Sequence, residues 1–270
     1  MLINSVLQKY PDLKRPEAIF EISNILTSQN EVKAYEDESH ASFRRKEGSC
    51  LKGVKIKPPF ATTWYDGYLA KQRLNFGFHC EEKKQCLYSR VYQNTIYGVI
   101  IVASQTIEMD DTFIIPEGSY ADIWVNKDVL ECKEDIKQYR RGFNSLFFSM
   151  HYTNGLLNCK NVSTAAHEFP NRRSIQHYKR ISKPYFEKYY TLKIEVPGQK
   201  RIIQSSNEGV DGYTRAFHIC RGHFKIYTEQ NPLFGKFTGT YWWNSQVRGD
   251  IKTGIIDKDY ELQLTNSVTS

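Results

Sequence analysis

The chain has 270 residues and a formal net charge of +7, from 37 lysines and arginines against 30 aspartates and glutamates. Hydrophobic residues make up 40% of it and aromatic residues 14%, which excludes a disordered chain and allows one large domain or two small ones. No apolar run approaches the ~20 residues that cross a bilayer, and the start lacks the features of a signal peptide, so we expect no membrane partner and a cytoplasmic location.

The first element in chain order is a helix predicted from Pro16 to Leu26. Pro16 suits a first helical turn, and Glu17 beside it suits the positive end of the helix dipole. The apolar positions at helical spacing are Ile19, Ile22, Ile25 and Leu26.

Strands and turns are predicted between about residues 60 and 129. Residues 87–92 and 97–103 are rich in aromatic and β-branched side chains, with a hairpin turn expected at Gln93 and Asn94. The second of these runs is apolar almost throughout, which favours an internal strand. Residues 113–116 and 120–125 predict another strand pair.

A second helix is predicted where the apolar period changes. Asp135 stands at its expected start, and Gly155 is expected to form a left-handed cap at its end. The residues that recur at helical spacing are Ile136, Tyr139, Phe143, Phe147 and Met150.

The segment from Asn171 to Lys193 is strongly basic, and aromatic residues lie between its charges. Short β-like runs follow it towards the C-terminus. The sequence therefore predicts an α+β fold with a mixed or antiparallel sheet and packed helices. We expect a core domain over residues 1–155, a basic aromatic connector over 156–200, and a small β-rich region over 201–270.

The cysteines and histidines do not form a metal-binding pattern. None of the six cysteines is part of a C-x-x-C pair, so we expect reduced thiols. His218, Cys220 and His223 lack a fourth ligand, and so does the looser group of His79, Cys80 and Cys86. We therefore predict no metal and no cofactor.

The segment from Arg215 to Thr228 is predicted to be strand, turn and strand, with Gly222 at a bend that a positive φ would allow. His218, Arg221 and His223 would then lie close together. One hypothesis makes them the catalytic groups of a metal-independent ribonuclease, with two histidines transferring protons and Arg221 stabilising the charged phosphate.

The competing hypothesis is a binding protein, and it is the one we favour over an enzyme. Lysine and arginine contact phosphates, and interleaved aromatic rings offer stacking surfaces, so RNA is a candidate ligand. An acidic protein partner would also suit the basic stretch. The predicted binding residues are Arg172, Arg173, Lys179, Arg180, Arg215, His218, Arg221, His223, Lys225 and Arg248.

The C-terminal part also carries a resemblance to a family. The residues concerned are Arg215, His218, Arg221-Gly222-His223-Phe224, Leu233-Phe234-Gly235, Gly239-Thr240-Tyr241-Trp242-Trp243 and Val247-Arg248-Gly249. They resemble the R-x-H-x-x-R-G-H-[FW] tail of proteins encoded by phages, prophages and plasmids, a group that includes a type V-A anti-CRISPR protein. Residues 143–155 resemble the apolar helix that precedes the tail in that family.

The resemblance implies a protein of a mobile element that acts inside a host cell. Its expected partner is a host immune protein or a ribonucleoprotein, with RNA as a possible direct ligand. Anti-CRISPR or counter-defence inhibition is the most concrete form of this expectation. A structural or assembly role in the mobile element is a third hypothesis.

Overall fold

The computed structural model describes residues 2–25, 51–69, 73–95, 98–115, 122–129, 136–168, 176, 180, 186, 188–195, 216–220, 222–243, 246–248 and 250–255. The helices whose bounds are described are α1 (Leu2–Lys9), α4 (Ile136–Leu157) and the 3-10 turn η1 (Lys127–Val129). The strands are β1 (Ala18–Glu21), β2 (Thr62–Leu69), β3 (Leu74–Lys83), β4 (Cys86–Thr95), β5 (Gly98–Glu108), β6 (Asp122–Val125), β7 (Val162–Glu168), β8 (Lys188–Ile194), β9 (Ala216–Cys220), β10 (His223–Tyr227), β11 (Gly239–Trp243), β12 (Gln246–Arg248) and β13 (Asp250–Ile255).

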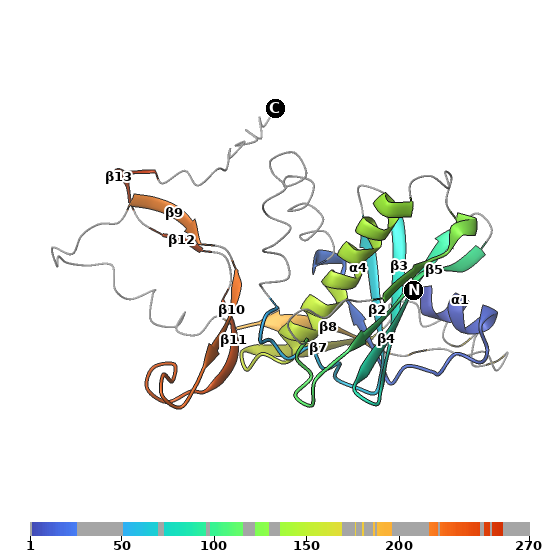
Figure 1. Ribbon diagram of the computed structural model, residues 1–270, viewed down its shortest axis with the longest axis horizontal. Coiled ribbons are helices and arrows are strands. Elements are labelled where there is room, and N and C mark those ends of the chain that lie inside the picture. Colours follow the sequence, from blue (N-terminus) through green and yellow to red (C-terminus); the bar gives the residue numbers. More distant parts are fainter. Residues whose placement is uncertain are drawn as a thin grey trace.

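An eight-stranded mixed sheet dominates the described structure, in the order β6-β5-β4-β3-β2-β1-β8-β7 (Figure 1). β1 runs parallel to both of its neighbours, β2 and β8, whereas the other neighbours in this sheet are antiparallel. A two-stranded sheet, β10-β11, and a three-stranded sheet, β12-β9-β13, follow towards the C-terminus. The predicted α+β class is confirmed.

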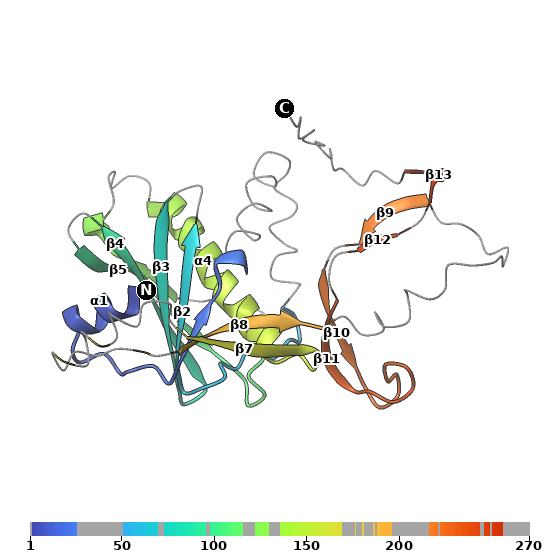
Figure 2. The ribbon, with the colours of Figure 1, turned by 180° about the vertical axis from the view of Figure 1, so that it is seen from behind.

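The two long faces of the large sheet are covered by different helices (Figure 2). Successive residues of a strand point to opposite faces, so Trp64 and Tyr65 in β2 enter different clusters. Trp64 is buried with α1, whose Ile3 and Val6 are fully covered. Tyr65 is buried on the other side with residues of α4, and its hydroxyl donates a hydrogen bond to Asn154 Oδ1.

Asp66 fixes the start of α1 against the sheet. Its Oδ1 accepts a hydrogen bond from the Leu2 amide at 3.3 Å and another from Trp64 Nε1 at 3.1 Å. The first amides of a helix have no partner within the helix, so a carboxylate there satisfies one of them. Burial is the main cause that raises the pKa of Asp66 above its ordinary value. The same carboxylate therefore holds the indole ring and the helix in fixed relation.

The helix predicted from Pro16 to Leu26 is wrong for its central part, because residues 18–21 form β1. Ile19 packs beneath α1, while Phe20 and Ile22 belong to the cluster on the α4 side. An internal parallel strand buries both faces and gives a nearly continuous apolar run, which also satisfies helical spacing over so short a stretch. Residues 23–25 are helical, and Leu26 lies outside the described residues.

The predicted hairpin over residues 87–103 is confirmed, and so is the internal position of its second strand. β4 and β5 pair antiparallel, and β5 also pairs with β6. The predicted turn residues, Gln93 and Asn94, belong to β4 instead, and the last pair of the hairpin joins Thr95 to Gly98. The second predicted pair is wrong: β6 forms, but Ile114 makes an isolated bridge to Lys55.

The second helix is confirmed as α4, but it continues past Gly155 to Leu157. A Cβ on Gly155 would lie 3.1 Å from Phe224 Cζ and 3.2 Å from Val54 Cγ1. Gly155 therefore allows other segments to approach the helix closely and does not cap it. Beyond α4 the large sheet continues across the predicted boundary at residue 155, because β7 and β8 complete it.

Candidate nucleic-acid interface

β10 and β11 form an antiparallel hairpin beside the ends of β7 and β8 (Figures 1 and 2). The pairing of Phe224 with Trp242 places both rings on one face of the hairpin. Those two rings contact each other edge-on with centroids 4.8 Å apart, and each contacts Tyr152 of α4 edge-on at 5.4 Å. This inner face anchors the hairpin to the main body.

Asn161 adds a polar clamp to this aromatic anchor. Its Nδ2 donates to the Trp242 carbonyl at 2.7 Å and to the Glu195 carbonyl at 2.8 Å, while its Oδ1 accepts from the Trp242 amide at 2.8 Å. The side chain thus satisfies the backbone of Trp242 as a neighbouring strand would. A further bond joins the Lys160 amide to the Thr240 carbonyl at 2.8 Å.

The outer face of the hairpin carries basic and aromatic side chains together. By alternation it holds His223, Lys225 and Tyr227 from β10, opposite Trp243, Tyr241 and Gly239 from β11. His223 and Lys225 are exposed. The Lys225 ammonium lies 4.9 Å from the centroid of the Tyr227 ring, which also contacts Tyr241 edge-on at 5.7 Å. Trp243 Nε1 is buried, and no acceptor for it lies among the described residues. We call these six residues the outer hairpin face.

The predicted binding residues fall into four groups. His223 and Lys225 lie on the outer hairpin face, and Arg180 is exposed elsewhere. His218 and Arg248 pair across β9 and β12, but their side chains are not described. The remaining predictions lie outside the described residues: Arg172, Arg173, Lys179, Arg215 and Arg221.

The predicted strand–turn–strand unit is wrong in its pairing. Both strands form, but β9 pairs with β12 and β13, whereas β10 pairs with β11. Gly222 is not among the glycines with positive φ. The two described strands therefore belong to different sheets and do not form the predicted hairpin.

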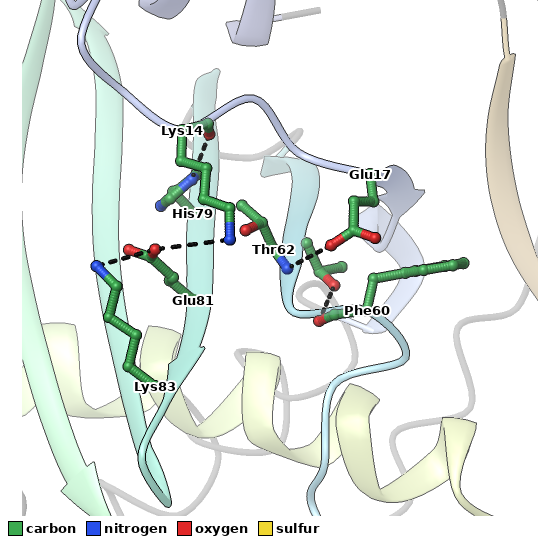
Figure 3. A network of polar contacts seen from close by, with 8 residues as sticks. Lys14, Glu17, Phe60, Thr62, His79, Glu81 and Lys83 are labelled. Atoms are coloured by element: carbon green, nitrogen blue, oxygen red, sulfur yellow. Dashed lines mark hydrogen bonds and ion pairs between the residues drawn. The ribbon is translucent and has the colours of Figure 1, made fainter.

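A second polar cluster, at the edge of the segment that leads into β1, joins Lys14, His79, Glu81 and Lys83 (Figure 3). The Lys83 ammonium lies 2.9 Å from Glu81 Oε1 and that of Lys14 lies 4.0 Å away. His79 Nε2 lies 3.0 Å from the Lys14 carbonyl, and burial lowers the pKa of His79. With Glu81 neutralised and His79 engaged by the backbone, we assign this cluster to the fold.

Cys80, Cys86 and Cys159 are free thiols, and burial raises the pKa of Cys80 and of Cys159 to about 12.

In the part of the chain that the structure describes, no three histidine, cysteine or acidic residues are grouped as metal ligands would be. The described helices include none that is long and apolar enough to pass through a bilayer.

The loop between β10 and β11 contains a type I′ turn at its tip. Phe234 and Gly235 have φ values of 52° and 72°, and the Lys236 amide donates to the Leu233 carbonyl at 3.1 Å. Phenylalanine rarely adopts this left-handed conformation, and its ring is 65% exposed.

We predict that Phe234→Asn stabilises the protein by about 1 kcal/mol, because Asn-Gly is the preferred pair for a type I′ turn and little buried surface is lost. Denaturant unfolding of both proteins measures the change, with Phe237→Asn as a control that alters exposure without relieving strain. A clear loss of stability in Phe234→Asn would show that the ring has a packing role.

The comparisons place this chain in no family. No protein-family model, no curated protein and no solved structure matches it.

Proposed function

We propose that the chain is a binding protein whose ligand is an RNA strand with unpaired bases, either free or within a ribonucleoprotein, and that the outer hairpin face contacts it. One observation carries the proposal: strand alternation exposes His223 and Lys225 on the same face as Tyr241 and Trp243, while the opposite face anchors the hairpin. Proteins that hold single strands combine cations for the phosphates with rings for the bases.

The balance of groups favours unpaired bases over a duplex. The outer hairpin face offers three aromatic rings but a single permanent cation, Lys225. Base stacking is worth about 1–3 kcal/mol per base, while a phosphate contact depends on salt. Stacking needs bases with a free face, which a duplex does not present along its length. The net charge of +7 would assist the approach of any polyanion.

The biological setting that we propose is counter-defence in a host cell. The support is the resemblance of the tail motif, part of which forms β10 and β11. A mobile-element protein that holds the RNA part of an immune ribonucleoprotein would act as an inhibitor of the anti-CRISPR kind. Protection of a targeted plasmid in cells with an active type V-A system tests this setting.

The RNA proposal predicts that the affinity for a labelled oligouridylate falls measurably, but with a shallow slope, as the salt concentration rises. Lys225→Ala should weaken binding and reduce the slope of log K against log salt by about 0.7, as expected for one lost phosphate contact on a single strand. Tyr241→Ala should weaken binding about tenfold with the slope unchanged. Fluorescence anisotropy at several salt concentrations measures both effects.

Lys127→Ala, at an exposed lysine of η1, is the matched control and should leave affinity and slope unchanged. Absence of oligouridylate binding at low salt would reject the proposal. An equal loss of affinity in Lys127→Ala and Lys225→Ala would mean that binding is diffuse and does not use the outer hairpin face.

A further inference from the structure

β7 is the terminal strand of the large sheet, and its outer edge faces no described strand (Figures 1 and 2). Its side chains are mostly exposed: those of Ser163, Thr164, Ala166, His167 and Glu168 are open to solvent. An edge strand of this kind presents unpaired amides and carbonyls to any chain that can pair with them.

Within the described residues, β7 lacks several of the features with which monomeric proteins protect an edge. It has seven residues with no proline and no lysine, and its ladder to β8 runs from Val162 to Glu168 without a register shift. β6, at the opposite end of the sheet, has four residues. Short strands, prolines, lysines and bulges are the usual devices against edge pairing. Of the two terminal strands that the structure describes in this sheet, β7 is thus the longer, and it has none of these four devices.

One hydrogen bond fixes which backbone groups of β7 point outward. The Glu195 amide donates to the Asn161 carbonyl at 2.8 Å, in line with the β7–β8 ladder. In an antiparallel pair, alternate residues direct both backbone groups to the same partner. Residues 163, 165 and 167 therefore face β8, and residues 162, 164, 166 and 168 face outward. The outward amide of Val162 is already bonded to the Cys159 carbonyl at 3.3 Å.

We propose that β7 pairs antiparallel with β7 of a second copy of this chain, about a twofold axis at Ala165. In this register Thr164 of one copy and Ala166 of the other exchange both of their outward hydrogen bonds. A twofold axis repeats each contact, so one strand supplies both halves of the interface. Two sheets would join into one continuous sheet.

The side chains of β7 suit this register. Ala165 meets its own counterpart in a pair without direct hydrogen bonds, where the Cα atoms approach to about 4.5 Å and side chains are closest. Alanine is small enough for that position. The two Glu168 carboxylates lie at opposite ends of the paired strands, so like charges do not meet. This self-complementarity is the reason to choose a second copy as the occupant over an unrelated strand.

The first test is the self-association of the whole protein by sedimentation equilibrium. A single strand pair buries less than the ~1,200 Å² of a standard interface, so we expect a dimer that dissociates in the micromolar range. Ala166→Pro removes an outward donor and no bond to β8, so it should fold and remain monomeric. Thr164→Lys should also be monomeric, whereas Thr106→Lys, the same change on the internal strand β5, should dimerise like the original.

The second test checks the register. Ala165→Cys should form a disulfide-linked dimer under mild oxidation, because the two residues meet at the axis. Ser163→Cys should not, since its two copies would be about 13 Å apart along the strands. The unaltered protein, with its own cysteines, gives the background. A protein that is monomeric at all concentrations, or a dimer that neither Ala166→Pro nor Thr164→Lys weakens, would overturn the proposal.

Discussion

Gly77→Ala should destabilise the protein by about 3 kcal/mol, the upper end of the range for overpacking a core. A Cβ at this position would lie 2.0 Å from Trp64 Cζ2 and 2.6 Å from Cη2. The indole ring is fully buried, and its Nε1 donates to Asp66. The ring cannot move aside without losing that bond and disturbing the start of α1. Urea unfolding followed by circular dichroism measures the loss.

The same substitution elsewhere gives the control. Gly142 is exposed on α4, and nothing lies within 4 Å of a Cβ built on it. Gly142→Ala should raise stability by about 1 kcal/mol, because alanine has the higher helix propensity. Opposite signs from two Gly→Ala changes would show that contact with Trp64 decides the first result. A loss below about 1 kcal/mol in Gly77→Ala would mean that the sheet and α1 adjust to the extra methyl group.

The sequence was sufficient to predict elements whose signal is local. α4 and the β4–β5 hairpin have long, regular apolar patterns, and both were found. Residues of β1 were predicted to be helical. Both faces of β1 are buried, one towards α1 and the other towards α4, and α4 is distant in the sequence. The two-residue turn between β3 and β4 also escaped prediction. Its residues, Lys84 and Gln85, have φ values of 48° and 63°, which their side chains do not favour.

Tertiary contacts explain that turn. The Met109 amide donates to the Gln85 carbonyl at 2.8 Å, and Gln85 Nε2 donates to Asp111. Both partners lie just after the end of β5, so a short window of sequence around the turn does not contain them. Local propensity was overridden by these bonds, as occurs where surrounding structure determines a turn.

Part of the candidate site was predictable, because that part of its signal is local in the sequence. Alternation along residues 223–227 shows that His223 and Lys225 share a face, and both are exposed. Burial was not predictable from alternation alone, because Ile226 alternates in step with Phe224 and is still 50% exposed. The partner of β10 was not predictable, because β9 is nearer in sequence than β11. The role of Asn161 was not predictable either, because it depends on Trp242, 81 residues away.

Asn161→Ala should destabilise the protein by about 3 kcal/mol, because it removes three hydrogen bonds and leaves three backbone groups without their partner. The aromatic contacts of Trp242 would remain but would no longer be positioned by its backbone. We therefore expect the β10–β11 hairpin to open before the large sheet unfolds. Limited proteolysis should cut within residues 222–243 faster than in the original protein, and tryptophan fluorescence should shift accordingly.

Asn161→Asp separates the loss of packing from the loss of donors. The carboxylate can still accept from the Trp242 amide, but its second oxygen faces the carbonyls of Trp242 and Glu195. At neutral pH this variant should be at least as unstable as Asn161→Ala. The repulsion raises the carboxyl pKa in the folded state, so stability should recover as the pH falls through that value and be lost again as it rises. Asn144→Ala, at an exposed position of α4, should be nearly neutral. If Asn161→Asp and Asn161→Ala change the free energy of unfolding by less than the control does, the aromatic contacts with Tyr152 hold the hairpin and the hydrogen bonds of Asn161 do not.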